Sequence, residues 1–361
     1  MVNWGIVGAG GISSRFVADL KVLIANPAGP NKIKHTIGAV ASTQIEKAEK
    51  FINEFIGDGY GTKAVGYDEV INDPSIDVLY IGLPHTLHAP FVVRAIEEGK
   101  KNILCEKPIT INARELEDIL AAAKKHNVFF MEAMWSRYFP TFLELQKKLY
   151  DDKVIGDIKK VQCTFNTDSK EFPITPEHRA ANKKLGGGAL LDIGIYPITY
   201  ARTFLDPSAD PTKDWSISSE LIMESLTGNK ADEVDFVASA IFNDKTRKQQ
   251  ASISASFHTE SDGNIVSIEG TLGRAYVKAI GDTPSPQGYK IVLKDGSVIE
   301  KDFFADLNGG EGFWYEAVEV GEVLAKGGKQ SELMSWDESR KIMWVLDTIR
   351  KQNDFFYEQD Q

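Results

Sequence analysis

Three ionisable side chains, Lys107, Asp192 and Tyr196, stand in patterns that suit proton transfer. Asp192 and Tyr196 are four residues apart in a segment with helical spacing, so both project from one face. Oxidation of an alcohol or hemiacetal needs a base for the hydroxyl proton while hydride leaves the same carbon. A free tyrosine has a pKa near 10, and a neighbouring ammonium lowers such a pKa. Tyr196 is therefore a candidate general acid/base if an ammonium such as that of Lys107 lies beside it. A core aromatic is the alternative for Tyr196.

A glycine-rich turn, Gly8-Ala9-Gly10-Gly11-Ile12-Ser13, follows an apolar segment at the start of the chain. It matches the dinucleotide-binding pattern G-x-G-x-x-G, except that Ser13 replaces the last glycine. Gly8 allows the tight turn, and Gly10 lets the backbone approach a pyrophosphate at the N-terminus of the next helix. We expect Gly8, Gly10, Gly11 and Ile12 to bind a dinucleotide.

The end of the second expected strand indicates which dinucleotide is bound. It reads Ala41-Ser42-Thr43-Gln44-Ile45, with no carboxylate before Glu46. A carboxylate there binds the ribose 2′-hydroxyl of NAD and repels a 2′-phosphate, whereas Ser42 and Thr43 can donate hydrogen bonds to one. NADP is therefore favoured over NAD. No arginine follows Ser42, so Lys47 or Arg15 is expected to supply the positive charge. The alternative for Ser42 is a helix N-cap.

Further candidates follow the later strands, because ligands bind at the carboxyl ends of parallel strands. The expected cofactor contacts there are Leu83, Pro84, His85, His88, Glu106 and Lys107. Arg179, in a polar loop over residues 168–185, is expected to reach the substrate together with Lys107, Asp192 and Tyr196. The six histidines have no partners at metal-ligand spacing, so no metal site is predicted.

The elements that position these residues change in character along the chain. Up to residue 132, strand and helix patterns alternate, which indicates a doubly wound parallel sheet of the Rossmann type. Residues 133–361 begin with helices, continue with successive strands from 216 to 303, and end with helices over 312–326 and 335–351. This order indicates an α+β domain with a large, mostly antiparallel open sheet. We expect an α/β protein with a cofactor domain, 1–132, and a substrate-binding and oligomerisation domain, 133–361.

Composition excludes several classes of protein. The formal net charge of −11 disfavours nucleic acid and anionic membrane surfaces as partners. No apolar run approaches the length needed to span a bilayer. The two cysteines, Cys105 and Cys163, indicate a reducing, cytoplasmic location, with Cys105 as a buried small residue.

Four stretches carry a resemblance to a known family. They are Glu106-Lys107-Pro108, the residues 131–140, the residues 186–196 and the residues 309–316. With the glycine-rich turn, they resemble the glucose–fructose oxidoreductase/inositol dehydrogenase (Gfo/Idh/MocA) family, in the branch of dihydrodiol and NADP-dependent D-xylose dehydrogenases. The resemblance implies a site in the cleft between two domains, with Lys107 by the nicotinamide and Asp192 and Tyr196 facing it. On that arrangement we expect Tyr196 to be the general acid/base, Lys107 to tune it and hydrogen-bond the reacting oxygen, and Asp192 to orient Lys107 or bind a substrate hydroxyl. The resemblance also places Trp135 and Arg137 beside the cofactor, with an ordinary surface arginine as the alternative for Arg137. It also implies a homodimer formed through the open sheet. Many members have histidine where this chain has Tyr196.

The resulting expectation is an NADP-dependent oxidoreductase that acts on a small molecule, either a D-xylose-like aldose or a cyclic trans-diol. One alternative is an NADPH-dependent reductase of keto-sugars. Another is a non-catalytic NADP-binding sugar sensor. A sensor need not keep Lys107, Asp192 and Tyr196, whereas this chain has all three.

Overall fold

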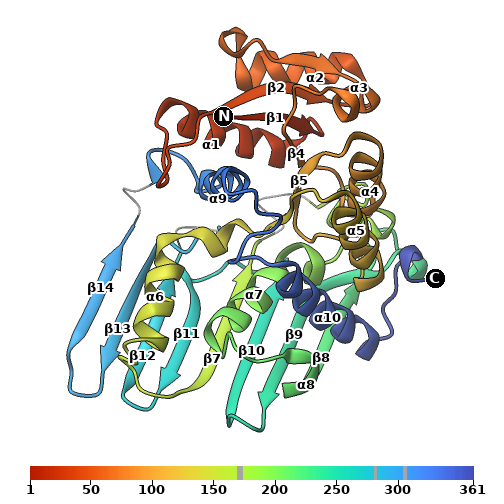
Figure 1. The fold of residues 1–361 in the computed structure, drawn as a ribbon. Helices are drawn as coiled ribbons and strands as arrows, with labels where there is room; N and C mark the ends of the chain where they lie inside the picture. Colours follow the sequence, from red (N-terminus) through yellow and green to blue (C-terminus); the bar gives the residue numbers. More distant parts are fainter. Residues whose placement is uncertain (169–173, 280–282, 304–306) are drawn as a thin grey trace. The chain divides into compact units, whose positions relative to one another are not determined.

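The computed structural model describes residues 1–168, 174–279, 283–303 and 307–361 (Figure 1). Its internal contacts group into two compact units. The first comprises Met1–Thr110, Arg114–Tyr138 and Leu307–Ser339, and the second comprises Ile111–Ala113, Phe139–Asp306 and Arg340–Gln361. The boundary expected after residue 132 follows the order of element types, whereas compactness also assigns residues 307–339 to the first unit. Each unit is described by itself below.

The first unit contains a six-stranded parallel sheet. In spatial order its strands are β3 (Lys63–Val65), β2 (His35–Ala41), β1 (Val2–Val7), β4 (Val78–Ile81), β5 (Asn102–Glu106) and β6 (Phe130–Ala133). Its helices are α1 (Gly11–Ala25), α2 (Ile45–Phe51), α3 (Tyr67–Asn72), α4 (His88–Gly99), α5 (Ala113–His126) and α9 (Trp314–Ala325). Because the chain order reverses at β1, which pairs with both β2 and β4, the expected doubly wound sheet is confirmed.

The interior of this unit joins α1, α9 and the central strands. Phe16 of α1 stacks on Tyr80 of β4, with ring centroids 3.9 Å apart and an interplanar angle of 6°. Asp19, also on α1, accepts hydrogen bonds from the backbone N–H groups of Glu311, Gly312 and Trp314. It therefore caps the N-terminus of α9 from another helix. An N-cap side chain that belongs to the helix itself contributes about 1 kcal/mol to stability.

The second unit contains an eight-stranded sheet in which only the pair β7–β10 is parallel. In spatial order its strands are β14 (Val298–Asp302), β13 (Gly288–Leu293), β12 (Gly273–Lys278), β11 (Asn264–Gly270), β7 (Ile158–Asn166), β10 (Gln249–Ser256), β9 (Val234–Asp244) and β8 (Trp215–Glu224). Its helices are α6 (Pro140–Tyr150), α7 (Ile195–Phe204), α8 (Pro211–Asp214) and most of α10 (Trp336–Gln352). The mostly antiparallel sheet expected for this part of the chain is confirmed.

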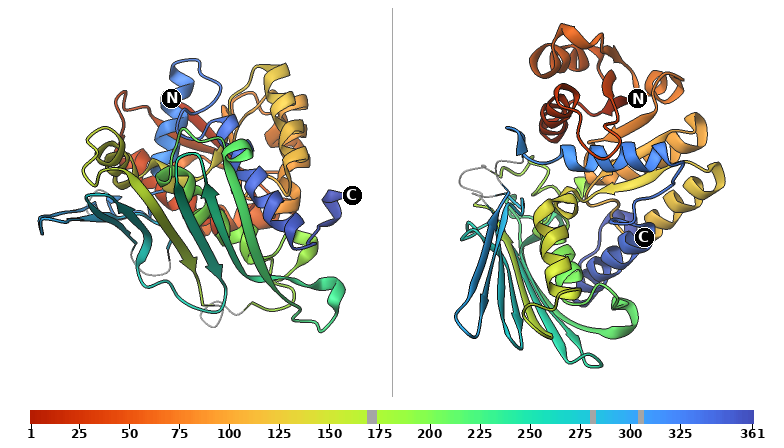
Figure 2. Two further views of the ribbon diagram at one scale, coloured as in Figure 1. Left: turned by 90° about the horizontal axis from the view of Figure 1, so that it is seen from below. Right: turned by 60° about the vertical axis from the view of Figure 1, so that its left-hand side comes forward.

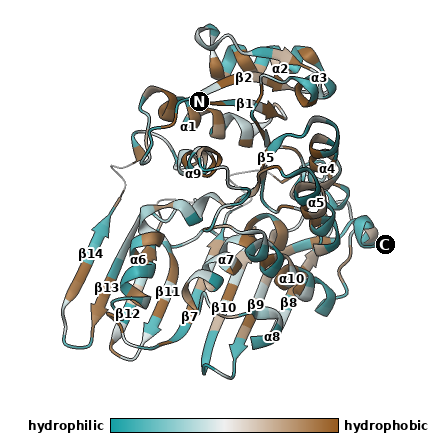
Figure 3. Cartoon of the chain, in the orientation of Figure 1, coloured by the Kyte–Doolittle hydropathy of each residue, from teal (hydrophilic) through white to brown (hydrophobic). Residues whose placement is uncertain are grey.

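Only one face of this sheet carries described helices. Buried and exposed residues alternate along β7, where Val161, Cys163 and Phe165 point inward. In Figure 2, α6 and α7 lie on that inner face, and no described helix of this unit covers the other. Figure 3 shows the corresponding mixture of apolar and polar residues along the strands. The sheet is therefore open on one side, as its alternating pattern predicts.

Two segments whose spacing predicts one continuous α-helix each contain a π-helical turn. The spacing over residues 189–205 predicts a helix, and the structure has a π-helical turn, Leu190–Gly194, followed by α7. The spacing over residues 45–55 predicts another, and the structure has α2 followed by a second π-helical turn, Ile52–Ile56. Of the polar loop expected at 168–185, residues 169–173 lie outside the described residues.

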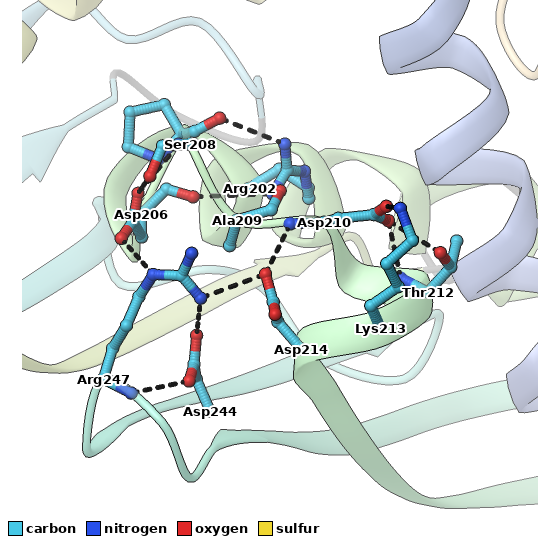
Figure 4. A network of polar contacts seen from close by, with 11 residues as sticks. Arg202, Asp206, Ser208, Ala209, Asp210, Thr212, Lys213, Asp214, Asp244 and Arg247 are labelled. Carbon is cyan, nitrogen blue, oxygen red and sulfur yellow. Dashed lines mark hydrogen bonds and ion pairs between the residues drawn. The ribbon is translucent and has the colours of Figure 1, made fainter.

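The short helix α8, which the sequence pattern did not indicate, is held by a polar network (Figure 4). Arg247 lies between three carboxylates, at 2.8 Å from Asp206, 3.0 Å from Asp214 and 2.8 Å from Asp244. Asp210 caps the helix by accepting the N–H of Thr212. A four-residue helix gains little from propensity, so these charges stabilise it.

Across the described ranges, no helix is both long and apolar enough to cross a membrane.

Candidate active site

The glycine-rich turn between β1 and α1 has the shape that a dinucleotide requires. Gly8 has a φ of +96°, and a Cβ there would lie 2.7 Å from the carbonyl oxygen of Gly82. A Cβ on Gly10 or Gly11 would instead meet no atom within 4 Å. The N-cap of α1 is Gly10, which provides no side-chain hydrogen bond, so the first N–H groups of the helix remain for a ligand. These features fit a pyrophosphate.

The end of β2 carries hydroxyl groups and no carboxylate. Ser42 is buried, and its backbone N–H donates to the carbonyl of Val65. The N-cap of α2 is Gln44, so the alternative interpretation of Ser42 as an N-cap is wrong. Thr43 and Lys47 are exposed. The segment after β2 therefore offers hydroxyl donors and no carboxylate at the place where a dinucleotide's ribose binds in this fold.

Arg15, which the sequence suggested as a cation for the cofactor, is paired with Glu311. Its guanidinium also lies 5.3 Å from the ring centroid of Phe313, which stacks on Trp135 at 4.1 Å. Both charged side chains are more than two-fifths exposed, at 44% and 43%. An ion pair this exposed contributes little to stability and exchanges readily with another anion.

Glu311→Gln is expected to strengthen NADPH binding by about two- to fivefold at low ionic strength, because Arg15 would keep its charge for the cofactor. The effect should shrink at high salt, where Coulomb interactions are screened. A fluorescence titration with NADPH at two salt concentrations measures both, with Glu332→Gln as a control far from Arg15 in the sequence. An unchanged Kd would show that Arg15 does not face the cofactor.

Lys107 follows β5 and is half-buried, with its backbone N–H donating to Oε2 of Glu106 at 3.2 Å. Oε1 of Glu106 accepts a 2.7 Å hydrogen bond from the hydroxyl of Tyr80. Burial raises the pKa of Glu106, and the nearby Lys107 charge opposes that shift. Glu106, an expected cofactor contact, is therefore anchored in the interior and supports the backbone of Lys107.

The histidines after β4 lie at the same edge of the sheet. Nδ1 of His88 lies 2.9 Å from the carbonyl oxygen of Pro108, and Nε2 lies 2.8 Å from that of Leu83. His88 thus joins the loops that follow β4 and β5, and burial lowers its pKa. His85 is buried beside it, with ring centroids 5.9 Å apart. Both ring nitrogens of His88 already have protein partners, which leaves its ring carbons for any contact with a cofactor.

Trp135 and Arg137 follow β6. Trp135 is buried, while Arg137 forms a 3.0 Å ion pair with Glu338 in which both side chains are largely covered, with exposed fractions of 14% and 12%. The alternative of an ordinary surface arginine is therefore wrong. Cys105 is buried, as expected.

In the second unit, two predicted substrate-binding residues lie together. Arg179 and Asp192 form an ion pair of 2.9 Å between Nη1 and Oδ1. Asp192 is buried in this pair, whereas Arg179 is about half exposed. Burial and the Arg179 charge lower the pKa of the neighbouring His178. Asp192 therefore has a cationic partner that the sequence did not assign to it.

Tyr196 lies in the first turn of α7, immediately after the π-helical turn that carries Asp192. It is 5% exposed and meets the ring of Phe165 edge-on, with centroids 5.4 Å apart. The next tyrosine in the row, Tyr200, donates a 2.6 Å hydrogen bond to the carbonyl of Pro284. A single π-helical turn within a helix is a frequent feature of functional sites.

The turn Gly186-Gly187-Gly188, which begins this segment, is held by two residues that sequence reasoning missed. Oδ2 of Asp235 accepts the N–H of Leu190 at 2.6 Å, and the hydroxyl of Tyr357 donates to the carbonyl of Gly187 at 2.6 Å. Gly188 has a φ of +124°, and a Cβ there would lie 2.2 Å from Oδ1 of Asp235. Asp235 and Tyr357 therefore position the start of the segment that carries Asp192 and Tyr196.

Asp235 makes the stability of the protein depend on pH. Burial raises its pKa to about 7, against the hydrogen bond from Leu190. In an unfolded chain this carboxyl titrates near pH 4, so the native state holds more protons between about pH 4 and pH 7. Its contribution to the free energy of unfolding is therefore complete below about pH 4 and is lost as the pH rises through about 7.

Asp235→Asn is expected to remove this loss. Relative to wild type, the variant should gain up to about 1.4 kcal/mol of unfolding free energy for each pH unit between about pH 5 and pH 7. Urea unfolding at several pH values measures the two slopes, with the exposed Asp152→Asn as a matched control. Parallel curves for wild type and Asp235→Asn would contradict the assignment.

Within the described ranges, no group of three or more His, Cys, Asp or Glu side chains could hold a metal ion. Lys107 belongs to the first unit, and Asp192 and Tyr196 belong to the second. The first unit alone, with an open glycine turn at β1 and a lysine after β5, defines a dinucleotide-binding domain of the Rossmann type.

Sequence profiles identify the family. Residues 2–134 match the profile described as an oxidoreductase family with an NAD-binding Rossmann fold, and residues 144–276 match the GFO/IDH/MocA C-terminal domain. The chain therefore belongs to the Gfo/Idh/MocA oxidoreductase family, and the predicted resemblance is confirmed.

Individual relatives align over nearly the whole chain. A trans-1,2-dihydrobenzene-1,2-diol dehydrogenase from Xenopus laevis is 34% identical, over 98% of this chain and 99% of the relative. A D-xylose 1-dehydrogenase (NADP(+)) from Hypocrea jecorina is 29% identical, over 99% and 93%. The structure of a 3-ketoreductase from Actinomadura kijaniata with NADP superposes with a TM-score of 0.77 at 23% identity, over 98% of each chain. The last likeness concerns the fold alone.

Proposed function

We propose that this protein is an NADP-dependent oxidoreductase that transfers hydride between a sugar or cyclic diol and nicotinamide. The observation that carries the proposal is the position of Lys107. It follows β5 at the edge of the parallel sheet where the turn after β1 lies open at Gly10 and Gly11. Residues 1–132 are proposed to bind the cofactor, and residues 133–361 to bind the substrate.

Proton transfer is assigned to Tyr196. In the oxidative direction its phenolate takes the proton of the substrate hydroxyl as the C–H electron pair leaves the same carbon as hydride. Nicotinamide, when bound, accepts that hydride. The Lys107 ammonium favours the phenolate and donates a hydrogen bond to the reacting oxygen. In the reductive direction Tyr196 returns the proton.

Asp192 and Arg179 are proposed to bind a second substrate hydroxyl. A carboxylate accepts a hydrogen bond from such a group, and a guanidinium donates one. Their 2.9 Å ion pair holds both side chains in place before substrate arrives. The observed pairing with Arg179 supports this role for Asp192.

The cofactor is proposed to lie along the carboxyl edge of the first sheet. Gly8, Gly10, Gly11 and Ile12 would hold the pyrophosphate, and Ser42, Thr43 and Lys47 would hold the 2′-phosphate. The loops with Leu83, Pro84 and His85, and Trp135 and Arg137 after β6, would border the nicotinamide half. NADP is favoured over NAD because β2 ends in hydroxyl groups and because a relative is an NADP(+)-dependent D-xylose dehydrogenase.

We also propose a homodimer formed through the open face of the second sheet, and a cytoplasmic location. The face exposes Ile241, opposite Ser218 of β8 and Ser252 of β10. Both cysteines are unpaired and buried, which suits a reducing compartment. Sedimentation of the wild type beside Ile241→Glu tests the dimer, since a charge at its centre should dissociate it.

The function is tested by following absorbance of the reduced cofactor over a panel of substrates. Xylose, glucose, arabinose and a trans-dihydrodiol are each offered with NADP and with NAD. A keto-sugar with NADPH tests the reverse direction. Turnover with NADP and at least one aldose or diol is expected. Binding of NADPH without turnover of any substrate would favour a non-catalytic sensor.

A further inference from the structure

Three buried ionisable side chains hold the backbone of the segment Lys107-Pro108-Ile109. Glu106 accepts the N–H of Lys107, and Nδ1 of His88 lies at hydrogen-bond distance from the carbonyl oxygen of Pro108. Oε1 of Glu132 accepts the N–H of Ile109 at 3.1 Å. Each of three consecutive residues therefore has its own side-chain partner, and all three partners are less than 5% exposed.

These partners reach the segment from both faces of the parallel sheet. In the register of β5 and β6, Cys105 pairs with Glu132 and Glu106 pairs with Ala133. Paired residues of parallel strands point to the same face, and successive residues point to opposite faces. Glu132 therefore approaches the segment from one face and Glu106 from the other, so the backbone of Lys107 is fixed between them.

Glu132 is the partner whose charge changes near neutral pH. Its second oxygen, Oε2, accepts a 2.7 Å hydrogen bond from the hydroxyl of Ser339. Burial raises its pKa to about 7, while the hydrogen bonds from Ser339 and Ile109 and the charge of Arg137 oppose the shift and Glu106 adds to it. Burial raises the pKa of Glu106 and of Cys105 and lowers that of His88.

The two states of Glu132 hold Ile109 differently. As a carboxylate it accepts from the N–H of Ile109 and from Ser339 at once, and hydrogen bonds to an ionised acceptor are the stronger kind. As a neutral acid it can donate from Oε2 to the hydroxyl of Ser339, but the N–H of Ile109 then donates to an uncharged oxygen, which is the weaker kind of hydrogen bond. The hold on the segment therefore tightens as Glu132 ionises.

We propose that Glu132 is a positioning residue for Lys107: its side chain accepts the N–H of Ile109 and thereby fixes the backbone that presents the lysine, and its charge state sets how firmly that backbone is held. The importance of that placement for turnover rests on the proposed function. The hold on residues 107–109 does not, because it can be measured without any substrate.

The experiment combines amide hydrogen exchange at Ile109 with the pH profile of kcat. After correction for the intrinsic exchange rate, wild-type protection of Ile109 should rise about tenfold from pH 6 to pH 8, with kcat rising over the same range. Glu132→Gln should abolish both steps and keep protection and kcat at every pH within about threefold of the wild-type values at pH 6, because the amide, like the neutral acid, carries no charge. Its amide can accept from Ile109 with Oε1 and donate to Ser339 with Nε2.

Two further variants separate positioning from loss of folding. Ser339→Ala removes one donor to the carboxylate, which should move both steps to higher pH without unfolding the protein. Glu132→Ala should lower protection and kcat about tenfold or more at pH 8. Wild-type protection that does not change with pH, or a step that persists in Glu132→Gln, would overturn the proposal.

Lys107→Met distinguishes this proposal from the proposed function. The variant should lose turnover and keep the pH-dependent protection of Ile109, because Glu132 contacts the backbone. If it instead retains full turnover, the catalytic assignment of Lys107 fails, while the exchange data still decide the role of Glu132.

Discussion

Tyr196→Phe is expected to lower kcat by about 10²- to 10⁴-fold, the usual contribution of a positioned general acid/base. The substitution removes only the hydroxyl, so the edge-on packing of the ring against Phe165 is kept. The Kd for NADPH should stay within about twofold, because the cofactor is assigned to the other unit. Single-turnover reduction of NADP with the best substrate, and a fluorescence titration with NADPH, measure the two quantities.

Tyr200→Phe is the matched control. It lies one helical turn further along α7, and its hydroxyl donates to the carbonyl of Pro284 at 2.6 Å. Removing that hydroxyl should cost about 1 kcal/mol of unfolding free energy and leave kcat within about threefold. Equal losses of turnover in the two variants, or unchanged turnover in Tyr196→Phe, would assign Tyr196 to the core rather than to proton transfer.

The fold follows from local patterns that the sequence displays openly. The strand at residues 2–7, the glycine turn and the helix after it follow each other within 25 residues. Hydrophobic periodicity and the position of the glycines therefore suffice to predict them. The alternation of buried and exposed residues in the later strands likewise indicates an open sheet. Local spacing also brought Asp192 and Tyr196 to one segment.

The sequence analysis missed the residues that position the candidate site because their hydrogen-bond partners lie far away in the sequence. Tyr357 contacts Gly187 across 170 positions, and Ser339 contacts Glu132 across 207. From the sequence alone, Asp235 cannot be told from an ordinary strand residue. Its role becomes visible only through the hydrogen bond that it accepts from the N–H of Leu190. The π-helical turn at Leu190–Gly194 has no composition of its own, and a helical pattern predicts an α-helix there. Long-range polar contacts are therefore the part of this site that only a structure supplies.

The same limit applies to the charge of the cofactor site. With a net charge of −11, the chain must bind an anionic cofactor through local groups. Arg15 was a reasonable candidate from its place one turn into α1, but Glu311, 296 positions away, occupies it. The uncapped N–H groups at Gly10 and Gly11 do not depend on any such partner. They are the firmer basis for a pyrophosphate site.

Lys107→Met is expected to lower kcat by about 10³-fold and to move the rising limb of the kcat/KM pH profile to higher pH. The shift has a definite sign. An ammonium beside a phenol favours the phenolate, so its removal raises the pKa of the base, and a higher pH is needed to form it. The backbone contacts of Glu106, His88 and Glu132 do not involve the lysine side chain, so the fold should be unchanged.

Lys107→Arg tests whether charge or shape matters at this position. It restores the positive charge with a planar guanidinium, so it should return the pH limb toward that of the wild type. The kcat should recover only about tenfold, because the compact ammonium is replaced by a larger, rigid fork of donors. Steady-state rates of all three proteins between pH 6 and pH 10 measure both effects. A limb that stays in place when the charge is removed would mean that Lys107 does not act on the proton acceptor. The loss of kcat would then reflect substrate binding alone, and the base would have to be tuned by another cation.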